Sequence, residues 1–119
     1  RVLKYFYSLV EKGDNKIIIN ISSEAGSISN CWRDREFSYC MSKASLNMLT
    51  KILHNFSKDK GIKVVSIHPG WMKTDMGGKD ADIYPQDASE GIIKLVKKLI
   101  PQKELTHQYF DYRGNPMRW

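Results

Sequence analysis

A tyrosine and a lysine four residues apart, Tyr39 and Lys43, are the first candidates for chemistry in this 119-residue sequence. Four residues make about one helical turn, so the phenol and the ammonium would lie on one helix face. A free phenol has a pKa of about 10, which makes it a poor acid or base at neutral pH. A neighbouring ammonium and a helix N-terminus both favour the phenolate. Tyr39 could therefore act as a general acid toward a carbonyl oxygen or as a base toward an alcohol.

Two polar segments follow the predicted strands. Ser22-Ser23 comes after a run of isoleucines, and His68-Pro69-Gly70 comes after a second β-branched run. In open α/β sheets, ligands bind beyond the carboxyl ends of the strands. Ser23 could donate a second hydrogen bond to a substrate oxygen there, and Ser22 is the less favoured candidate. Hydride would have to come from a cofactor, because no side chain supplies it.

The elements that must position these groups alternate between helix and strand. The patterns predict a helix stopped by Gly13, strands over 16–22 and 62–67, a long helix over 38–60, a helix ended by Pro101 and a strand over 108–112. Asp87 and Glu90 have capping-box spacing before the third helix. The connections are long enough for right-handed crossovers, so the strands should be parallel. The expected fold class is α/β, a partial Rossmann-type, doubly wound parallel sheet of about three strands with flanking helices.

The start of the chain suggests a missing neighbour. The first helix has no N-cap, and the isoleucine-rich strand over 16–22 reads as covered on both faces although nothing before it could pair with it. We therefore expect that a segment upstream is missing, by truncation, by proteolysis or by the way the chain was delimited. The long helix carries a broad apolar stripe, made of Met41, Ala44, Met48, Leu49, Ile52, Leu53 and Phe56.

Charge and cysteine content narrow the function classes. The chain has 19 Lys and Arg against 13 Asp and Glu, a net charge of +6, but no basic run is longer than Lys97-Lys98. A scattered distribution favours a solvated surface over a nucleic-acid interface. No apolar stretch approaches the roughly 18 residues of a membrane span, and since the chain shows no basic-then-apolar leader we expect no secretion. Cys31 and Cys40 match no disulfide or zinc pattern, so we expect buried or half-buried thiols and a cytoplasmic location.

Three segments together resemble the downstream half of the short-chain dehydrogenase/reductase family. They are Asn-Ile-Ser-Ser at 20–23, Tyr-Cys-Met-Ser-Lys at 39–43 and Pro-Gly-Trp-Met-Lys-Thr at 69–74. A Tyr-x-x-x-Lys alone is a weak signal, and the strength lies in the combination. Segments 23–28, 68–71 and 74–78, with the ending at 110–114 and Trp119, are similar to the sniffer-like or C-factor-like carbonyl reductases. The resemblance covers essentially the whole chain.

The resemblance implies an oxidoreductase that uses NAD or NADP to reduce an aldehyde or ketone, or to oxidise the alcohol, by hydride transfer. Tyr39 would be the general acid/base, and Ser23 would polarise and orient the substrate carbonyl. Lys43 would lower the phenol pKa and hold the nicotinamide ribose hydroxyls. Residues 1–119 would form the C-terminal half of a single Rossmann-type domain.

The resemblance also implies a set of cofactor contacts. Pro69 and Gly70 would line the nicotinamide pocket, Trp71, Met72 and Thr74 would address the carboxamide, and the loop over 75–84 would be a mobile substrate lid. The family's Gly-rich pyrophosphate turn, its NAD/NADP selector and its active-site Asn would lie upstream. The chain therefore lacks the N-terminal dinucleotide-binding half and holds almost none of the adenosine side.

Several alternatives remain open. Tyr39 and Lys43 could be an ordinary exposed pair, Ser23 a turn residue and Thr74 a cap, while His68 reads better as hydrogen-bonded to backbone than as a metal ligand. A hydrolase using Ser23 and Lys43 is disfavoured because no oxyanion hole is evident.

Two hypotheses about the whole chain follow. One is an enzyme with a small-molecule carbonyl or alcohol substrate whose other half comes from elsewhere. The other is a truncated, catalytically silent α/β module that cannot hold the cofactor alone and self-associates. In either case we expect a homo-oligomer, joined through the first strands or the long helices.

Overall fold

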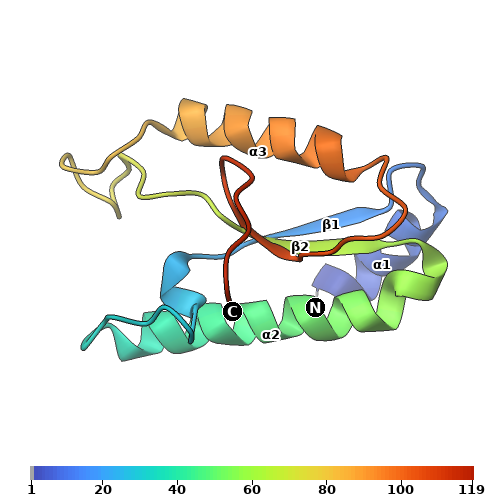
Figure 1. The fold of residues 1–119 in the computed structure, drawn as a ribbon, viewed down its shortest axis with the longest axis horizontal. Coiled ribbons are helices and arrows are strands. Elements are labelled where there is room, and N and C mark those ends of the chain that lie inside the picture. The colour runs from blue at the N-terminus through green and yellow to red at the C-terminus, as the bar shows by residue number, and fades with distance from the viewer. Residues whose placement is uncertain (1) are drawn as a thin grey trace.

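The alternation of helix and strand is confirmed by the computed structural model, which describes residues 2–119. In chain order the elements are α1 (Val2–Lys12), β1 (Ile17–Ile21), the 3₁₀ turn η1 (Glu24–Gly26), α2 (Phe37–Ser57), the 3₁₀ turn η2 (Lys58–Lys60), β2 (Lys63–His68), α3 (Pro85–Leu99) and β3 (Tyr109–Asp111). Figure 1 shows three layers, with the sheet between α3 on one face and α1 and α2 on the other. The fold is the predicted partial Rossmann-type arrangement.

The three strands form one parallel sheet in the order β1-β2-β3. Ile21 is opposite Ile67, and Ser66 is opposite Tyr109. The carboxyl ends of all three strands therefore meet at one edge of the sheet. Within residues 2–119, β1 pairs only with β2, which leaves its other side as the open edge that the sequence predicts.

The apolar core lies between the sheet and α3. It consists of Val65, Ile67, Leu95, Leu99, Leu105 and Phe110. Ile17 and Ile19 pack against this cluster but are only partly buried, and Ile21 is 47% exposed. The prediction that β1 is covered on both faces is therefore wrong for this chain, because its open edge leaves these side chains within reach of solvent.

The fully buried side chains that α2 contributes to its contact with the sheet are polar. The buried residues of α2 are Asn47, Thr50 and Ser57. The Thr50 hydroxyl accepts a hydrogen bond from the Asn20 amide at 2.8 Å and lies 2.8 Å from the Ser66 hydroxyl. The apolar stripe of α2 faces outward instead, and most of its larger members are exposed, namely Met41, Met48, Leu49, Ile52 and Phe56.

Several boundaries differ from the predicted ones. The Asp87–Glu90 capping box does not start α3, because the helix begins earlier, at Pro85, whose fixed φ suits the first helical position. α2 ends at Ser57, and η2 continues the turn to Gly61, which stops it with a left-handed φ of 70°. β3 has three residues instead of five. No helix within residues 2–119 is long and apolar enough to cross a membrane.

Candidate active site

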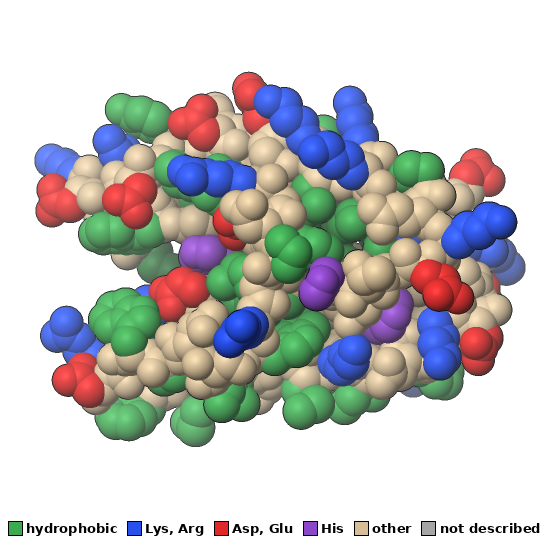
Figure 2. Space-filling model, in the orientation of Figure 1, with side chains coloured by type: hydrophobic (Ala, Val, Ile, Leu, Met, Phe, Trp, Pro, Cys, Tyr) green, Lys and Arg blue, Asp and Glu red, His purple; other side chains and the backbone are tan. Residues whose placement is uncertain are grey.

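The candidate site lies at the carboxyl ends of β1 and β2. The Ser22 amide donates to the Ile67 carbonyl at 2.8 Å, so the segment that follows β1 runs beside the segment that follows β2. In the view of Figure 2 the surface is hollowed at this end of the molecule, between the loop that follows η1 and the loop that follows β2. This is the position at which an open α/β sheet binds its ligands.

Ser23 caps η1 and is held at both of its oxygens. Its side-chain oxygen accepts from the Ala25 amide at 3.2 Å. Its carbonyl oxygen accepts from the Gly26 amide at 2.9 Å and from the Tyr109 hydroxyl at 2.6 Å. Because the Ser23 hydroxyl accepts in this arrangement, its own proton remains available for a ligand oxygen. Ser22 is buried too, but its hydroxyl donates to the Asn47 side chain at 2.6 Å.

Tyr39 and Lys43 lie together near the start of α2, as their spacing predicts. The Lys43 ammonium nitrogen is 5.7 Å from the centre of the Tyr39 ring. The same nitrogen donates to the Ile21 carbonyl at 3.0 Å, which ties the helix to the end of β1. Both side chains are half-buried. An ammonium has three donors, so Lys43 keeps two for other acceptors.

Ser23 and η1 together form what we call the Ser23 turn, residues 23–26. This turn packs directly against the part of α2 that carries Lys43. A Cβ on Gly26 would lie only 2.6 Å from the Lys43 carbonyl carbon, so no side chain fits between turn and helix. Asn47, one turn beyond Lys43, donates to the Gly26 carbonyl at 3.1 Å. The prediction missed Asn47, although its place four residues after Lys43 on the same helix face would have pointed to it.

Pro69 and Gly70 follow β2 in a tight turn. Pro69 is buried, and Gly70 has a φ of 85°, which favours glycine. A Cβ on Gly70 would lie 2.6 Å from the end of the Ile83 side chain. The backbone of the loop is pinned near its base, where the Lys73 amide donates to the Ile83 carbonyl at 2.9 Å. This bond brings the end of the predicted lid, residues 75–84, back to the base of the loop near the end of β2.

The cofactor-binding residues predicted in this loop are engaged with the loop itself. The Trp71 indole donates to the Gly77 carbonyl at 2.8 Å. The Thr74 hydroxyl accepts from the Gly77 amide at 3.1 Å and lies 3.5 Å from the Met72 carbonyl oxygen. Thr74 thus caps a short turn, the alternative that the sequence leaves open for it.

His68 is the last residue of β2, and Tyr109, whose hydroxyl reaches Ser23, is the first residue of β3. Burial lowers the pKa of His68, while the carboxylates of Glu24 and Asp111 oppose that shift. The Nδ1 atom of His68 is buried without a hydrogen-bond partner among the described residues, so the predicted backbone bond is wrong for this atom. Burial raises the pKa of Tyr109 to about 12, which keeps its hydroxyl protonated at any working pH.

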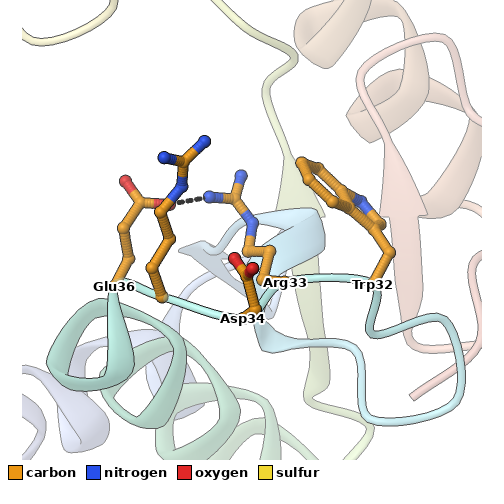
Figure 3. A pocket seen from close by; sticks show the side chains of 5 residues that line it. Trp32, Arg33, Asp34 and Glu36 are labelled. Carbon is orange, nitrogen blue, oxygen red and sulfur yellow. Dashed lines mark hydrogen bonds and ion pairs between the residues drawn. The ribbon is translucent and has the colours of Figure 1, made fainter.

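A pocket of about 350 Å³ lies on the loop before α2 and is lined by residues 32–36. Figure 3 shows Arg33 between Trp32 and Glu36, with its guanidinium linked to the Glu36 carboxylate. Arg33 also pairs with Glu24, and this hydrogen bond is the main reason that the pKa of Arg33 is raised. The positive charge of Arg33 is therefore already compensated by the carboxylates of Glu24 and Glu36.

Cysteines and acidic residues suggest no metal centre. Cys31 is exposed and Cys40 is half-buried, so the expectation of a buried or half-buried thiol is wrong for Cys31. It lies on the polar loop before α2. Among residues 2–119, no group of three or more His, Cys, Asp or Glu side chains could hold a metal ion.

Comparison with known proteins connects this geometry to one family. The sequence profile of the short chain dehydrogenases matches residues 1–84. The chain is 32% identical to C-signal of Myxococcus xanthus over 110 residues, which cover 92% of this chain and 65% of C-signal. It is also 32% identical to an uncharacterised oxidoreductase of Schizosaccharomyces pombe, with coverage of 95% of this chain and 51% of the relative.

Two solved structures share the fold at similar identity. The carbonyl reductase Sniffer of D. melanogaster superposes with a TM-score of 0.88 at 30% identity, covering 99% of this chain and 51% of Sniffer. The NADPH-bound carbonyl reductase from chicken fatty liver has a TM-score of 0.83 at 32% identity, with coverage of 99% and 51%. The chain thus spans between half and two thirds of the length of these four proteins.

Proposed function

This chain belongs to the short-chain dehydrogenase family, and we propose that it forms the catalytic half of an NAD- or NADP-dependent carbonyl reductase. In this proposal, residues 1–119 are the C-terminal half of one Rossmann-type domain. The whole enzyme reduces an aldehyde or ketone, or oxidises the corresponding alcohol. Sniffer and the chicken enzyme are carbonyl reductases, the latter with bound NADPH, and this supports the choice of substrate and cofactor class.

The donor groups present fit the nicotinamide side of such a cofactor. Lys43 has two free donors, enough for the two hydroxyls of a ribose, and it stands beside the Tyr39 ring. Pro69 and Gly70 form the turn at the end of the neighbouring strand. Neither strand-to-helix connection, 22–36 or 69–84, carries the Gly-x-Gly-x-x-Gly turn that binds a pyrophosphate. The rest of the protein would have to supply that turn.

When bound, a reduced nicotinamide supplies hydride to the carbonyl carbon. Tyr39 donates its phenolic proton to the carbonyl oxygen as negative charge develops there. The Ser23 hydroxyl, whose proton is free, donates a second hydrogen bond to the same oxygen and orients it. Lys43 places its positive charge 5.7 Å from the centre of the Tyr39 ring, beside the phenolate that remains after the transfer. In the alcohol direction the same groups act in reverse, with Tyr39 as the base.

The loop after β2 completes the proposed site. We assign to the backbone around Trp71 and Met72 and to Thr74 the contacts with the nicotinamide carboxamide, and to residues 75–84 the role of a substrate lid. The hydroxyl of Thr74 already serves its own turn, so its contact would require this turn to adjust on binding.

One observation carries the proposal: the Lys43 ammonium bridges the Tyr39 ring and the end of β1, and the Ser23 turn packs directly against the backbone of Lys43. The test is Tyr39→Phe in the whole protein, which removes the proton donor and keeps the ring. Turnover of an aldehyde or ketone should fall by roughly 10²–10⁴-fold, while the Kd for NADPH or NADH changes little. Tyr5→Phe, on the exposed face of α1, is the matched control. Retained turnover in Tyr39→Phe would remove Tyr39 from this role.

A second candidate is a catalytically silent module that self-associates. The open edge of β1 and the outward apolar stripe of α2 favour it, because both surfaces need a cover. We propose that the covering partner is a second copy packed along the long helices. The two free cysteines support a cytoplasmic location for either candidate.

A further inference from the structure

Tyr109 reaches across the sheet to the proposed active-site serine. Its hydroxyl donates to the Ser23 carbonyl at 2.6 Å although the two residues are 86 positions apart. The same carbonyl accepts from the Gly26 amide at 2.9 Å. Two donors therefore hold the Ser23 carbonyl, and a rotation of this peptide would break both bonds.

The last four residues, 116–119, form what we call the C-terminal strap. The strap folds back on β3, where the Met117 amide donates to the Tyr109 carbonyl at 2.8 Å. The Trp119 ring stacks on the Tyr109 ring, with centroids 5.1 Å apart and planes 18° apart. Figure 1 shows this end of the chain leaving the sheet and running toward α2.

The strap also holds the far side of the Ser23 turn. The Ser27 hydroxyl donates to the Arg118 carbonyl at 2.7 Å. The Ser29 amide donates to the Trp119 carbonyl at 2.8 Å. Segment 23–29 is therefore tied to β3 and the strap at three points, through the side chain of Tyr109 and the backbone of residues 118 and 119.

We propose that Tyr109 and the C-terminal strap are positioning elements for Ser23, and that they aim its hydroxyl at the substrate oxygen. This inference rests on the proposed function, in which Ser23 donates to that oxygen. The Ser23 side chain and carbonyl share one backbone unit, so the bonds that fix the peptide also fix the direction of the Cα–Cβ bond. Because burial keeps Tyr109 protonated, its donor bond persists across the working pH range.

Neither element touches the substrate in this proposal. Asn47 holds the same turn from the α2 side, through the Gly26 carbonyl. The turn thus lies between α2 on one side and β3 with the strap on the other. A hydroxyl displaced by about 1 Å can lose up to roughly 10²-fold in rate, so the support from both sides is expected to be visible in turnover.

The test compares Tyr109→Phe with Tyr7→Phe in the whole protein. Both substitutions remove a tyrosine hydroxyl that donates to a distant residue, since Tyr7 donates to the Ser57 hydroxyl at 3.0 Å, far along α2 from the site. Trp119→Ala removes the stacked ring, and Trp119→Phe restores an aromatic one. Carbonyl reduction gives kcat and KM, and hydrogen–deuterium exchange reports on the amides of segment 23–29.

Tyr109→Phe and Trp119→Ala should lower kcat by roughly tenfold, leave the KM for NADPH within twofold, and speed exchange in segment 23–29. Tyr7→Phe should change none of these, and Trp119→Phe should recover most of the lost kcat. An active wild type whose Tyr109→Phe variant keeps its kcat, with or without faster exchange, would overturn the inference. Equal losses in Tyr7→Phe would overturn it as well. An inactive wild type would instead overturn the proposed function itself, and with it the catalytic part of this inference.

Discussion

Gly26→Ala should push the Ser23 turn away from α2 and lower both stability and turnover. A Cβ at this position would lie 2.6 Å from the Lys43 carbonyl carbon and 2.7 Å from the Lys43 oxygen. Ordinary contacts begin at 3.4 Å, so turn and helix must separate by about 0.8 Å. Backbone atoms cannot swing aside as a side chain does. The Asn47 amide nitrogen, 2.9 Å from the same point, is crowded too.

The size of the effect follows from this overlap. Overpacking of this kind costs about 1–3 kcal/mol of unfolding free energy, and a shift approaching 1 Å at a catalytic group costs up to roughly 10²-fold in rate. We therefore expect Gly26→Ala to lower the urea midpoint of the whole protein and to reduce kcat by roughly ten- to a hundredfold. The KM for the nicotinamide cofactor should change less, because Lys43 stays on its own helix.

Gly13→Ala is the matched control. A Cβ on Gly13 would lie 3.4 Å from the Leu9 carbonyl oxygen and 3.5 Å from that of Val10, both ordinary contacts. Its unfolding free energy should stay within about 0.5 kcal/mol of the wild type, with kcat unchanged. If Gly26→Ala behaved like Gly13→Ala in both assays, the turn and α2 would not be in the tight contact described, and the reasoning would fail.

Further predictions concern the buried polar groups and the chain on its own. Thr50→Val should lower the free energy of unfolding in urea by about 1–3 kcal/mol, because Asn20 and Ser66 lose a buried partner; an unchanged midpoint would speak against this network. Burial lowers the pKa of His68 in the folded state, so below about pH 6.5 the unfolded state binds more protons and stability falls as the pH falls. His68→Gln should flatten this decline in urea midpoints measured from about pH 7 to pH 5, and an unaltered slope would assign the dependence to other groups. The isolated 119-residue chain should show no saturable micromolar binding of NADPH or NADH by tryptophan fluorescence, since it has no pyrophosphate turn; saturation would favour a competent enzyme. It should sediment as a dimer or larger species, and a monodisperse monomer would contradict the proposed self-association.

The element order and the strand-end site could be predicted from sequence because both depend on local patterns. Isoleucine runs and helical periodicity predict β1 and α2 without any knowledge of their neighbours. Tyr39 and Lys43 share a helix face by spacing alone, and parallel strands bring Ser23 and Pro69 to the same edge of the sheet. The sheet that results also matches the shared fold of the relatives.

The role of each face of α2 could not be predicted in the same way. Periodicity identifies the apolar stripe, but the sheet takes the opposite, polar face with Asn47 and Thr50. The partners of that face, such as Ser66, come from distant parts of the chain. Nothing in the helix sequence says that a serine and an asparagine will stand opposite it. The bond between Tyr109 and Ser23 was missed for the same reason, because it joins residues 86 positions apart.

The hydrogen bonds between α2 and the sheet determine where the helix can lie against the strands. Dispersion contacts between aliphatic side chains have no preferred direction. Hydrogen bonds such as that from Asn20 to Thr50 do depend on direction, and they fix the rotation and the axial height of α2 against β1 and β2. Tyr39 and Lys43 belong to the same continuous helix as Thr50. The alignment of the two groups to which we assign the chemistry therefore depends on hydrogen bonds made about three helical turns away. A substitution at Thr50 that breaks these bonds should shift Tyr39 as well.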